Sequence, residues 1–323
     1  MRIRSLATAA ALTALSAVAA HAADTTPEAQ AHVAAAKRIA GDDLAIAQRI
    51  FCKTSKEMDE LRNLGGFAKN YDMHYMEPVR VFDNVYAMGL TTVTVYAIST
   101  PDGIILIDAF YDDGIDSVLV PSLKKVGLDP ARIKYIVVTH GHVDHYGGAR
   151  RLQDRYGARV MMSAADWDFV EKSKAPPETK PKRDMVITEG QHFTFGGQSI
   201  DFSFIPGHTP GAVGLIFPVK EHGRPHMAAI FGGTQFGDMP VGQMQTYLHS
   251  IDHFANLTRK AGVDVELASH AIADDTIPKM IVLRDLPDIR PNPLVMTPAS
   301  YQRFLQVHKE CMAAAAPKAA GGG

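Results

Sequence analysis

Cysteine is scarce in this chain, with two residues, Cys52 and Cys311, among 323. Two cysteines so far apart in sequence exclude a zinc site built from thiolates, which takes several cysteines at short spacing. In an oxidising compartment the two could form one disulfide that joins the N-terminal region to the C-terminal helix. The alternative is a pair of free, buried thiols.

An excess of charge of either sign is also missing. The chain has 33 Lys and Arg residues against 35 Asp and Glu residues, a formal net charge of -2. This balance gives no electrostatic footprint for nucleic acid, so we expect a small-molecule substrate and no nucleic-acid partner. The hydrophobic share of 46% is that of an ordinary globular domain. Nothing in the composition indicates an oligomeric state.

Long apolar runs are missing except at the N-terminus. There, Arg2 and Arg4 precede an apolar stretch at 6–20, and Ala20-His21-Ala22 is a small-x-small cleavage signal. The stretch is short for a membrane span, which takes about 20 residues. We therefore predict that 1–22 is a signal peptide and that the mature protein is periplasmic or secreted, without stable membrane insertion. The alternative is a membrane anchor.

The rest of the chain alternates between strand and helix patterns. We expect an N-terminal helical extension at 23–70, with helix over 27–63, then a catalytic domain at 71–312 and a disordered tail at 313–323. Two runs of strands, each followed by helices, predict an α/β fold. The expected architecture is an αββα sandwich, with two mixed sheets packed face to face and helices outside. The expected strands are 79–82, 85–88, 92–99, 104–107, 133–138, 159–162, 185–188, 192–195, 199–205, 213–219, 227–231 and 265–268.

Metal-ligand side chains are concentrated directly after the apolar strand at 133–138. The sequence there is Thr-His-Gly-His-Val-Asp-His, with His140, His142, Asp144 and His145 within six residues. Neutral imidazole and carboxylate are usual zinc ligands, and a catalytic site must leave some coordination open to water. The alternative is a polar, histidine-rich surface turn.

Two more histidines also follow apolar strands. His208 lies between Pro206-Gly207 and Pro210-Gly211, and His270 follows the expected strand at 265–268. Strand ends that converge on one edge of a sandwich bring distant residues together, so we expect both histidines at the same metal site. Taken alone, each could instead be a turn histidine.

These motifs together, Thr-His-Gly-His-Val-Asp-His-Tyr-Gly-Gly, Pro-Gly-His-Thr-Pro-Gly and a last histidine after a strand, resemble the metallo-beta-lactamase superfamily over about 75–310. The resemblance implies two zinc ions per chain with a water between them. His140, His142 and His208 would bind the first ion, and Asp144, His145 and His270 the second. A histidine directly after Asp144 is most similar to the subclass B3 beta-lactamases.

The residue expected to bridge the two metals in most hydrolases of the superfamily is an aspartate, and Gly233 stands in its place. True beta-lactamases lack this aspartate. The chain departs from subclass B3 at Ala271, where many members have proline, and it has no lysine within 232–239. The resemblance implies an exported zinc hydrolase that opens beta-lactam rings, with Asp144 as a catalytic residue orienting the water. The alternatives are a hydrolase of another cyclic ester or amide, such as a lactonase, and an iron-dependent oxidoreductase of the same fold.

Further residues are predicted to support the site. Asp108, at the end of the strand 104–107, and Thr209 would hold ligand histidines, although each could be only a turn residue. For Trp167, the alternative to the groove is packing of its helix on the sheet. The residues expected to line the substrate groove are Tyr146, Trp167, Thr234, Phe236 and Met239.

Overall fold

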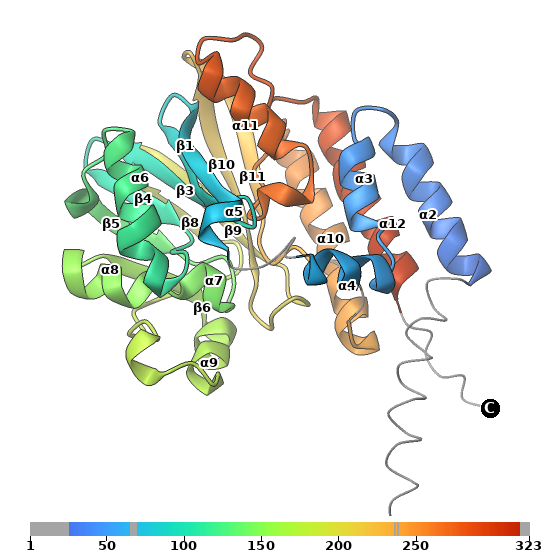
Figure 1. Ribbon diagram of the computed structural model, residues 1–323, viewed down its shortest axis with the longest axis horizontal. Helices are drawn as coiled ribbons and strands as arrows, with labels where there is room; N and C mark the ends of the chain where they lie inside the picture. The colour runs from blue at the N-terminus through green and yellow to red at the C-terminus, as the bar shows by residue number, and fades with distance from the viewer. Residues whose placement is uncertain (1–25, 65–69, 236, 238, 317–323) are drawn as a thin grey trace, which may run out of the picture.

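The computed structural model describes residues 26–64, 70–235, 237 and 239–316. The predicted signal peptide and Phe236 lie outside the described residues. Two mixed β-sheets pack face to face with helices on both outer faces (Figure 1), which confirms the expected αββα sandwich. Within the described part of the chain, no helix is both long and apolar enough for a membrane span.

The first sheet has seven strands in the order β1-β2-β3-β4-β5-β6-β7. Neighbours from β1 to β4 are antiparallel, and those from β4 to β7 are parallel. The parallel half places the ends of β4, β5 and β6 at one edge of the sheet. The strands are β1 (Tyr75–Phe82), β2 (Val85–Leu90), β3 (Val93–Thr100), β4 (Gly103–Ile107), β5 (Ile133–Val137), β6 (Arg159–Ser163) and β7 (Met185–Ile187).

The second sheet has five strands in the order β12-β11-β10-β9-β8. Its β11 and β12 are parallel, and the other pairs are antiparallel. The last strand ends at Glu266 and is shorter than the predicted 265–268, although the Leu267 N–H still donates to the Ala229 carbonyl over 3.1 Å. The strands are β8 (His192–Phe195), β9 (Gln198–Phe204), β10 (Val213–Glu221), β11 (Arg224–Phe231) and β12 (Val265–Glu266).

Three apolar clusters make up the core. One fills the space between the sheets, and the other two lie between each sheet and its outer helices. In β10, Leu215 and Phe217 face the first cluster while Ile216 faces the helices, as expected from the alternation of side chains along a strand. Both faces of the central strands are therefore buried, which is why they read as continuous apolar runs.

Helices cover the two sheets differently. On the first sheet they are short: η2 (Ile115–Leu119), α6 (Val120–Lys125), α7 (Val143–Tyr146), α8 (Ala149–Tyr156) and α9 (Ala164–Lys172). On the second sheet they include the long helices α10 (Val241–Ala261) and α12 (Pro298–Ala315). The helix α12 runs three residues into the predicted tail, and residues 317–323 lie outside the described residues. A short α5 (Tyr71–His74) precedes β1, and α11 (Thr276–Asp285) packs against β1.

The N-terminal extension forms three helices instead of a single helical region over 27–63. They are α2 (Pro27–Ala40), α3 (Ala45–Phe51) and α4 (Ser55–Asn63). Gly41 ends α2 with a φ of 60°, a conformation that favours glycine. A disulfide joins Cys52, which directly follows α3, to Cys311 in α12. Both α2 and α3 pack along α12 (Figure 1), so the extension is part of the sandwich.

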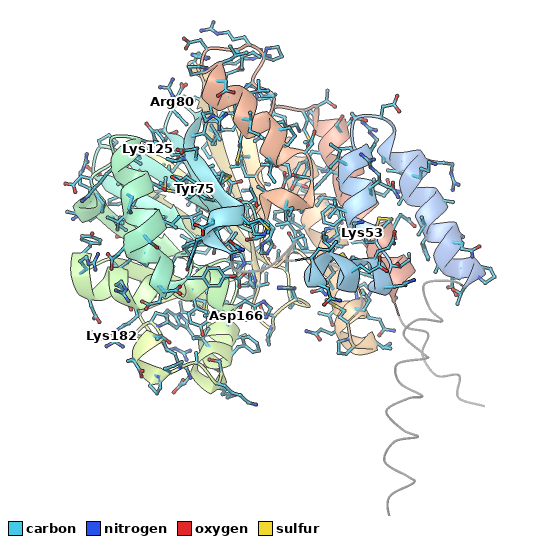
Figure 2. The ribbon with its side chains drawn as sticks, viewed as in Figure 1. Lys53, Tyr75, Arg80, Lys125, Asp166 and Lys182 are labelled. Carbon is cyan, nitrogen blue, oxygen red and sulfur yellow. A yellow bond between two sulfur atoms is a disulfide. The ribbon has the colours of Figure 1, made fainter. Side chains whose placement is uncertain are left out.

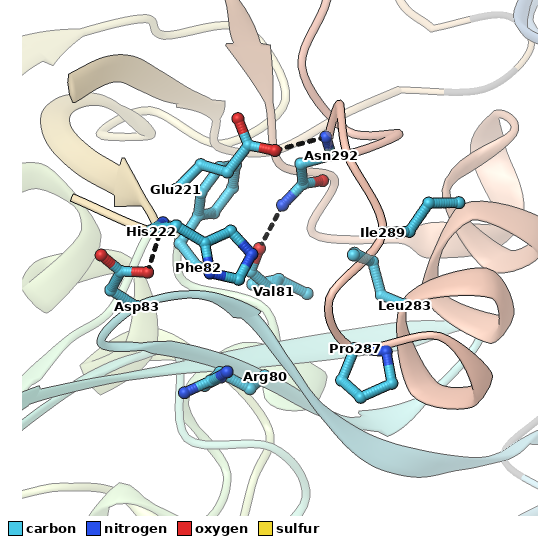
Figure 3. A pocket seen from close by; sticks show the side chains of 10 residues that line it. All are labelled: Arg80, Val81, Phe82, Asp83, Glu221, His222, Leu283, Pro287, Ile289 and Asn292. Atoms are coloured by element: carbon cyan, nitrogen blue, oxygen red, sulfur yellow. Dashed lines mark hydrogen bonds between the residues drawn. The ribbon is translucent and has the colours of Figure 1, made fainter. Parts of the chain in front are cut away.

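A small cavity lies between the end of β1, at Arg80–Phe82, and the loop that follows α11 (Figure 3). The Asn292 side chain donates a hydrogen bond to the Val81 carbonyl over 2.7 Å, and its backbone N–H donates to Glu221 over 2.6 Å. The cavity holds about 20 Å³, room for a single water. These contacts tie the loop to both sheets, and we assign the cavity no ligand.

Candidate metal centre

The histidine motif occupies the loop between β5 and α7, at the edge where the parallel strands end. His140 and His145 are fully buried. Asp108 holds the loop in place. It directly follows β4, the strand that pairs with β5 in the sheet. Asp108 has a φ of 65°, an unusual backbone conformation for a residue other than glycine. Such strain persists where the surroundings fix the residue, and here its hydrogen bonds do so.

The six predicted ligands form two groups in the structure. His140, His142 and His208 make up one group, and Asp144, His145 and His270 make up the other. Within each group, the potential ligand atoms all lie within 4.8 Å of one another. The His140 ring lies between the two groups, with centroid distances of 4.7 Å to His208 and 3.9 Å to His145. The side chains therefore gather in the same two groups of three that the resemblance implied, and each group could hold a metal ion.

A buried nitrogen atom without a partner indicates that the residues fit a metal. The Nε2 atom of His140 is buried and has no hydrogen-bond partner among the described residues, whereas His145 Nε2 lies 3.2 Å from Asp144 Oδ2. An unpaired polar atom in such a place carries a desolvation cost that a bound cation would remove. Nitrogen and carboxylate donors in sets of three are the donors that zinc takes at catalytic sites.

The protonation of the histidines also suits metal binding. Burial lowers the pKa of His208 to about 3, and burial holds the pKa of His140 well below its usual value. Both imidazoles are therefore neutral at pH 7, as a ligand must be. For His145, burial lowers the pKa, but the charges of Asp144 and Asp108 outweigh burial and raise it to about 10. In this second group, a metal would take the place of a proton between carboxylates.

Hydrogen bonds orient the ligand rings through their other nitrogen atoms. His145 Nδ1 lies 2.7 Å from Asp108 Oδ2, and His208 Nδ1 lies 2.8 Å from Gln235 Oε1. His270 Nδ1 bonds the Thr92 carbonyl. Such contacts fix the ring orientation and leave Nε2 for a metal. The structure places Asp108 as predicted, whereas Gln235 and Thr92 carried no signal in the sequence.

Asp166 on α9 is a residue of the site that sequence reasoning missed. Its buried carboxylate accepts hydrogen bonds from Gly141 N–H (2.7 Å), Gly211 N–H (2.8 Å) and the Thr209 hydroxyl (2.7 Å). Figure 2 shows it where α9 approaches the histidine loop. One carboxylate thus joins the loop of His140 and His142 to the loop of His208. The Thr209 hydroxyl donates to Asp166, so Thr209 supports the site through this carboxylate.

Gly233 lies against the ring of His208, and a side chain at this position would be strained for two reasons. Its φ of 73° favours glycine, and an added Cβ would lie 3.0 Å from both Cβ and Cδ2 of His208. A carboxylate at residue 233 would therefore require the His208 ring to shift. Among the described residues, the candidate ligands are the six in the two groups above.

Two connected spaces open from the site. The first, about 210 Å³, is lined by four of the histidines together with Asp144, Met58, Thr234 and Gln235 among others. The second, about 570 Å³, is a mostly apolar groove beside it. Tyr111 and His142 line both spaces. The groove is formed by the loop after α9 and the start of α7, including Val143, Tyr146, Phe169, Ala175 and Pro176.

The predicted groove residues are placed unequally. Tyr146 and Thr234 line the spaces described above. Trp167 does not: it is buried in the cluster beneath the first sheet, and its indole N–H donates to the Met185 carbonyl over 2.9 Å. Its assignment to the groove is corrected, because its helix turns the ring towards the sheet. Met239 packs against the cluster under the second sheet instead of lining the site. Phe236 is outside the described residues.

Comparisons with known proteins agree with this site. Residues 88–221, which include the histidine loop and His208, match the family described as the metallo-beta-lactamase superfamily. Among curated proteins, a hydroxyacylglutathione hydrolase of a Synechococcus species is 32% identical over 117 residues, covering 36% of this chain and 42% of that protein. The hydroxyacylglutathione hydrolase GloC of Haemophilus influenzae is 28% identical, covering 37% of this chain and 60% of that protein. The chain thus spans about half the length of these relatives.

Solved structures extend the likeness to most of the fold. BJP-1, a subclass B3 metallo-beta-lactamase of Bradyrhizobium japonicum, superimposes with a TM-score of 0.61 at 24% identity, covering 72% of this chain and 90% of that chain. The FEZ-1 metallo-beta-lactamase of Legionella gormanii gives a TM-score of 0.60 at 24% identity, covering 71% and 92%. At this identity the likeness establishes the shared fold.

Proposed function

The chain is a member of the metallo-beta-lactamase superfamily, because residues 88–221 match the family's model and the two sheets have the family's fold, and we propose that it is a zinc-dependent hydrolase. We propose that it opens the beta-lactam ring of a small-molecule substrate. The hydrolase class follows from the family. The two zinc ions, the cyclic amide substrate and the location outside the cytoplasm are our proposals.

One observation carries the choice of substrate. The structure brings six candidate ligands into two groups of three, and residue 233, where a bridging carboxylate would stand beside His208, is a glycine. By resemblance, most other hydrolases of the superfamily have that carboxylate, whereas beta-lactamases lack it. The likeness to subclass B3 structures over about nine-tenths of their chains supports the same choice.

The residues of the site divide the work of hydrolysis. Bound zinc would supply Lewis acidity, which polarises the scissile carbonyl and makes water a nucleophile at neutral pH. His140, His142 and His208 would hold one ion, and Asp144, His145 and His270 the other. Asp144 is partly exposed to the cavity, so its carboxylate can also accept a hydrogen bond from the attacking water and orient it. The apolar groove would receive the part of the substrate that does not react.

A second candidate is hydrolysis of an ester or thioester. It is favoured by the curated relatives, which are named hydroxyacylglutathione hydrolases and match about a third of this chain. The same six ligands serve either reaction, because both begin with attack of water on a carbonyl. Which of the two reactions the enzyme catalyses therefore depends on how the site binds the parts of the substrate away from the reacting bond.

We also propose that the protein acts outside the cytoplasm, in the periplasm or after secretion. The disulfide between Cys52 and Cys311 supports this location, because disulfides persist in oxidising compartments. A fusion of residues 1–30 to a reporter that is active only after export would test it directly.

The experiment that tests the proposed function compares substrates on one purified protein. A cephalosporin, a carbapenem, a lactone and a hydroxyacylglutathione are each supplied to the zinc-loaded enzyme, before and after EDTA. We expect EDTA-sensitive turnover that is fastest with a beta-lactam, and its loss in His142→Ala. The matched control is His249→Ala, which removes an exposed histidine from α10. Faster turnover of the thioester or lactone would select the second candidate or the lactonase alternative.

A further inference from the structure

One wall of the metal cavity comes from the N-terminal extension. Met58 on α4 lines the same space as His140, His142, His208 and His270, and its side chain is 1% exposed. Gly237 lies beside it, since a Cβ added there would be 3.9 Å from Met58 Cγ. A residue about eighty positions before the histidine loop thus reaches the site.

The helix that carries Met58 has little else to hold it. Among the α4 side chains that the structure describes, Met58 alone is fully buried and Leu61 is partly buried, while Lys56, Glu57, Glu60 and Asn63 are exposed. The start of the helix is fixed locally, because the Thr54 hydroxyl and the Glu57 carboxylate cap each other's backbone N–H groups. Packing of α4 as a whole does not explain why Met58 stays over the cavity.

The anchor lies directly before α4. Cys52 follows α3 and is joined to Cys311, a buried residue of α12. Beside this disulfide, Phe51 stacks on His308 of α12 with ring centroids 4.2 Å apart. The helix α3 also contacts η5 (Ala271–Ala273), the turn that follows His270. The disulfide thus fixes the chain two residues before the cap of α4.

We propose that Met58 is a specificity-determining residue of the metal cavity and that the Cys52–Cys311 disulfide positions it there. A thioether on an unbranched side chain adapts to apolar surfaces of irregular shape. Met58 therefore selects ligands that carry an apolar group next to the metal-binding atoms. The inference rests on the proposed metal site, and the identity of the hydrolysed bond does not enter it.

The test uses straight-chain alkanehydroxamates, from acetohydroxamate to hexanohydroxamate, as probes. The hydroxamate group binds zinc, and the length of its alkyl chain reports on the apolar walls of the cavity. A hydroxamate, unlike a thiol, does not reduce the disulfide. Dissociation constants are measured by calorimetry on zinc-loaded protein, with the metal content of each variant determined in parallel. In the wild-type protein we expect affinity to rise by up to about four-fold for each methylene that is buried.

Variants separate Met58 from the rest of the cavity. Met58→Ala should flatten the dependence on chain length without changing the metal content, and Met58→Leu should restore it. The double variant Cys52→Ser, Cys311→Ser should behave like Met58→Ala. The control Lys56→Ala, an exposed position of the same helix, should behave like the wild-type protein.

An unchanged chain-length dependence in Met58→Ala overturns the role of Met58. A flattened dependence in Met58→Ala together with a wild-type dependence in the double cysteine variant overturns the role of the disulfide. If zinc-loaded wild-type protein binds no hydroxamate at all, the proposed metal-dependent function fails, and this inference fails with it.

Discussion

Asp108 and His145 form a buried pair in which the carboxylate accepts a hydrogen bond from the imidazole Nδ1 over 2.7 Å. The same carboxylate accepts hydrogen bonds from the N–H and the hydroxyl of Thr139, at 2.8 and 3.0 Å. One side chain at the end of β4 therefore orients a proposed ligand and fixes the start of the histidine loop. The other nitrogen of His145, Nε2, lies 3.2 Å from Asp144 Oδ2, a member of the same candidate metal group.

Asp108→Asn should weaken the binding of one zinc ion and spare the other. Asparagine tolerates a positive φ, so the backbone is kept, but the charge that orients His145 is lost. Replacing such a partner typically costs about 10- to 100-fold in metal affinity. A zinc competition titration measures it, with the exposed Asp102→Asn as control. Equal affinities in both variants would contradict the orienting role.

Asp166→Ala should destabilise the fold and weaken both metal positions. It leaves the N–H groups of Gly141 and Gly211 and the Thr209 hydroxyl buried without their acceptor. We expect a loss of about 3 kcal/mol or more in the free energy of unfolding, and about 1 kcal/mol for Thr209→Val. Urea denaturation measures both. Asp168→Asn on the same helix, whose carboxylate is exposed, should change little; an equal loss there would show a general effect of the helix.

Phe169→Ala should raise KM for substrates with an apolar side group and leave kcat unchanged. The ring lines the apolar groove and lies 6.0 Å from the His142 ring. Because Phe169 is still 37% exposed, substrate binding would cover only part of it, and we expect a loss of about 1 kcal/mol, close to five-fold in KM. Val186→Ala, an exposed apolar truncation on β7, is the matched control. A fall in kcat alone would mean that Phe169 acts on the reacting centre.

The free energy of unfolding should fall on acidification partly through His308. Burial lowers the pKa of His308 to about 4 in the folded chain, against about 6.5 when unfolded. The unfolded state therefore binds the proton first, and stability is lost as pH falls from about 6.5 to about 4, by about 2 kcal/mol at pH 5. Urea unfolding at pH 7 and pH 5 should show a smaller difference in His308→Gln. An equal difference would contradict this assignment.

The candidate ligands could be predicted from the sequence because each lies in a short motif directly after an apolar strand. His140, His142, Asp144 and His145 are neighbours in the chain, and the glycines and prolines around His208 mark its turn. The sandwich followed from two runs of strands with helices after each. These signals are local, so no knowledge of the folded chain was needed.

The supporting residues could not be read in this way because their roles depend on contacts between distant segments. Asp166 lies in an ordinary amphipathic helix, and only the fold shows that it joins two loops. Met58 lies in a polar helix that the sequence places outside the catalytic domain. Trp167 misled the groove prediction because its helical phase, which points to the sheet, is set by packing.

The central claim is that six residues hold two zinc ions, and zinc content per chain tests it most directly. We predict about two zinc ions in the wild-type protein, measured by mass spectrometry after dialysis, and about one in His208→Ala and in His270→Ala. These variants each remove a ligand from a different group. Wild-type protein that retains no zinc, or variants that retain the full wild-type content, would contradict the account.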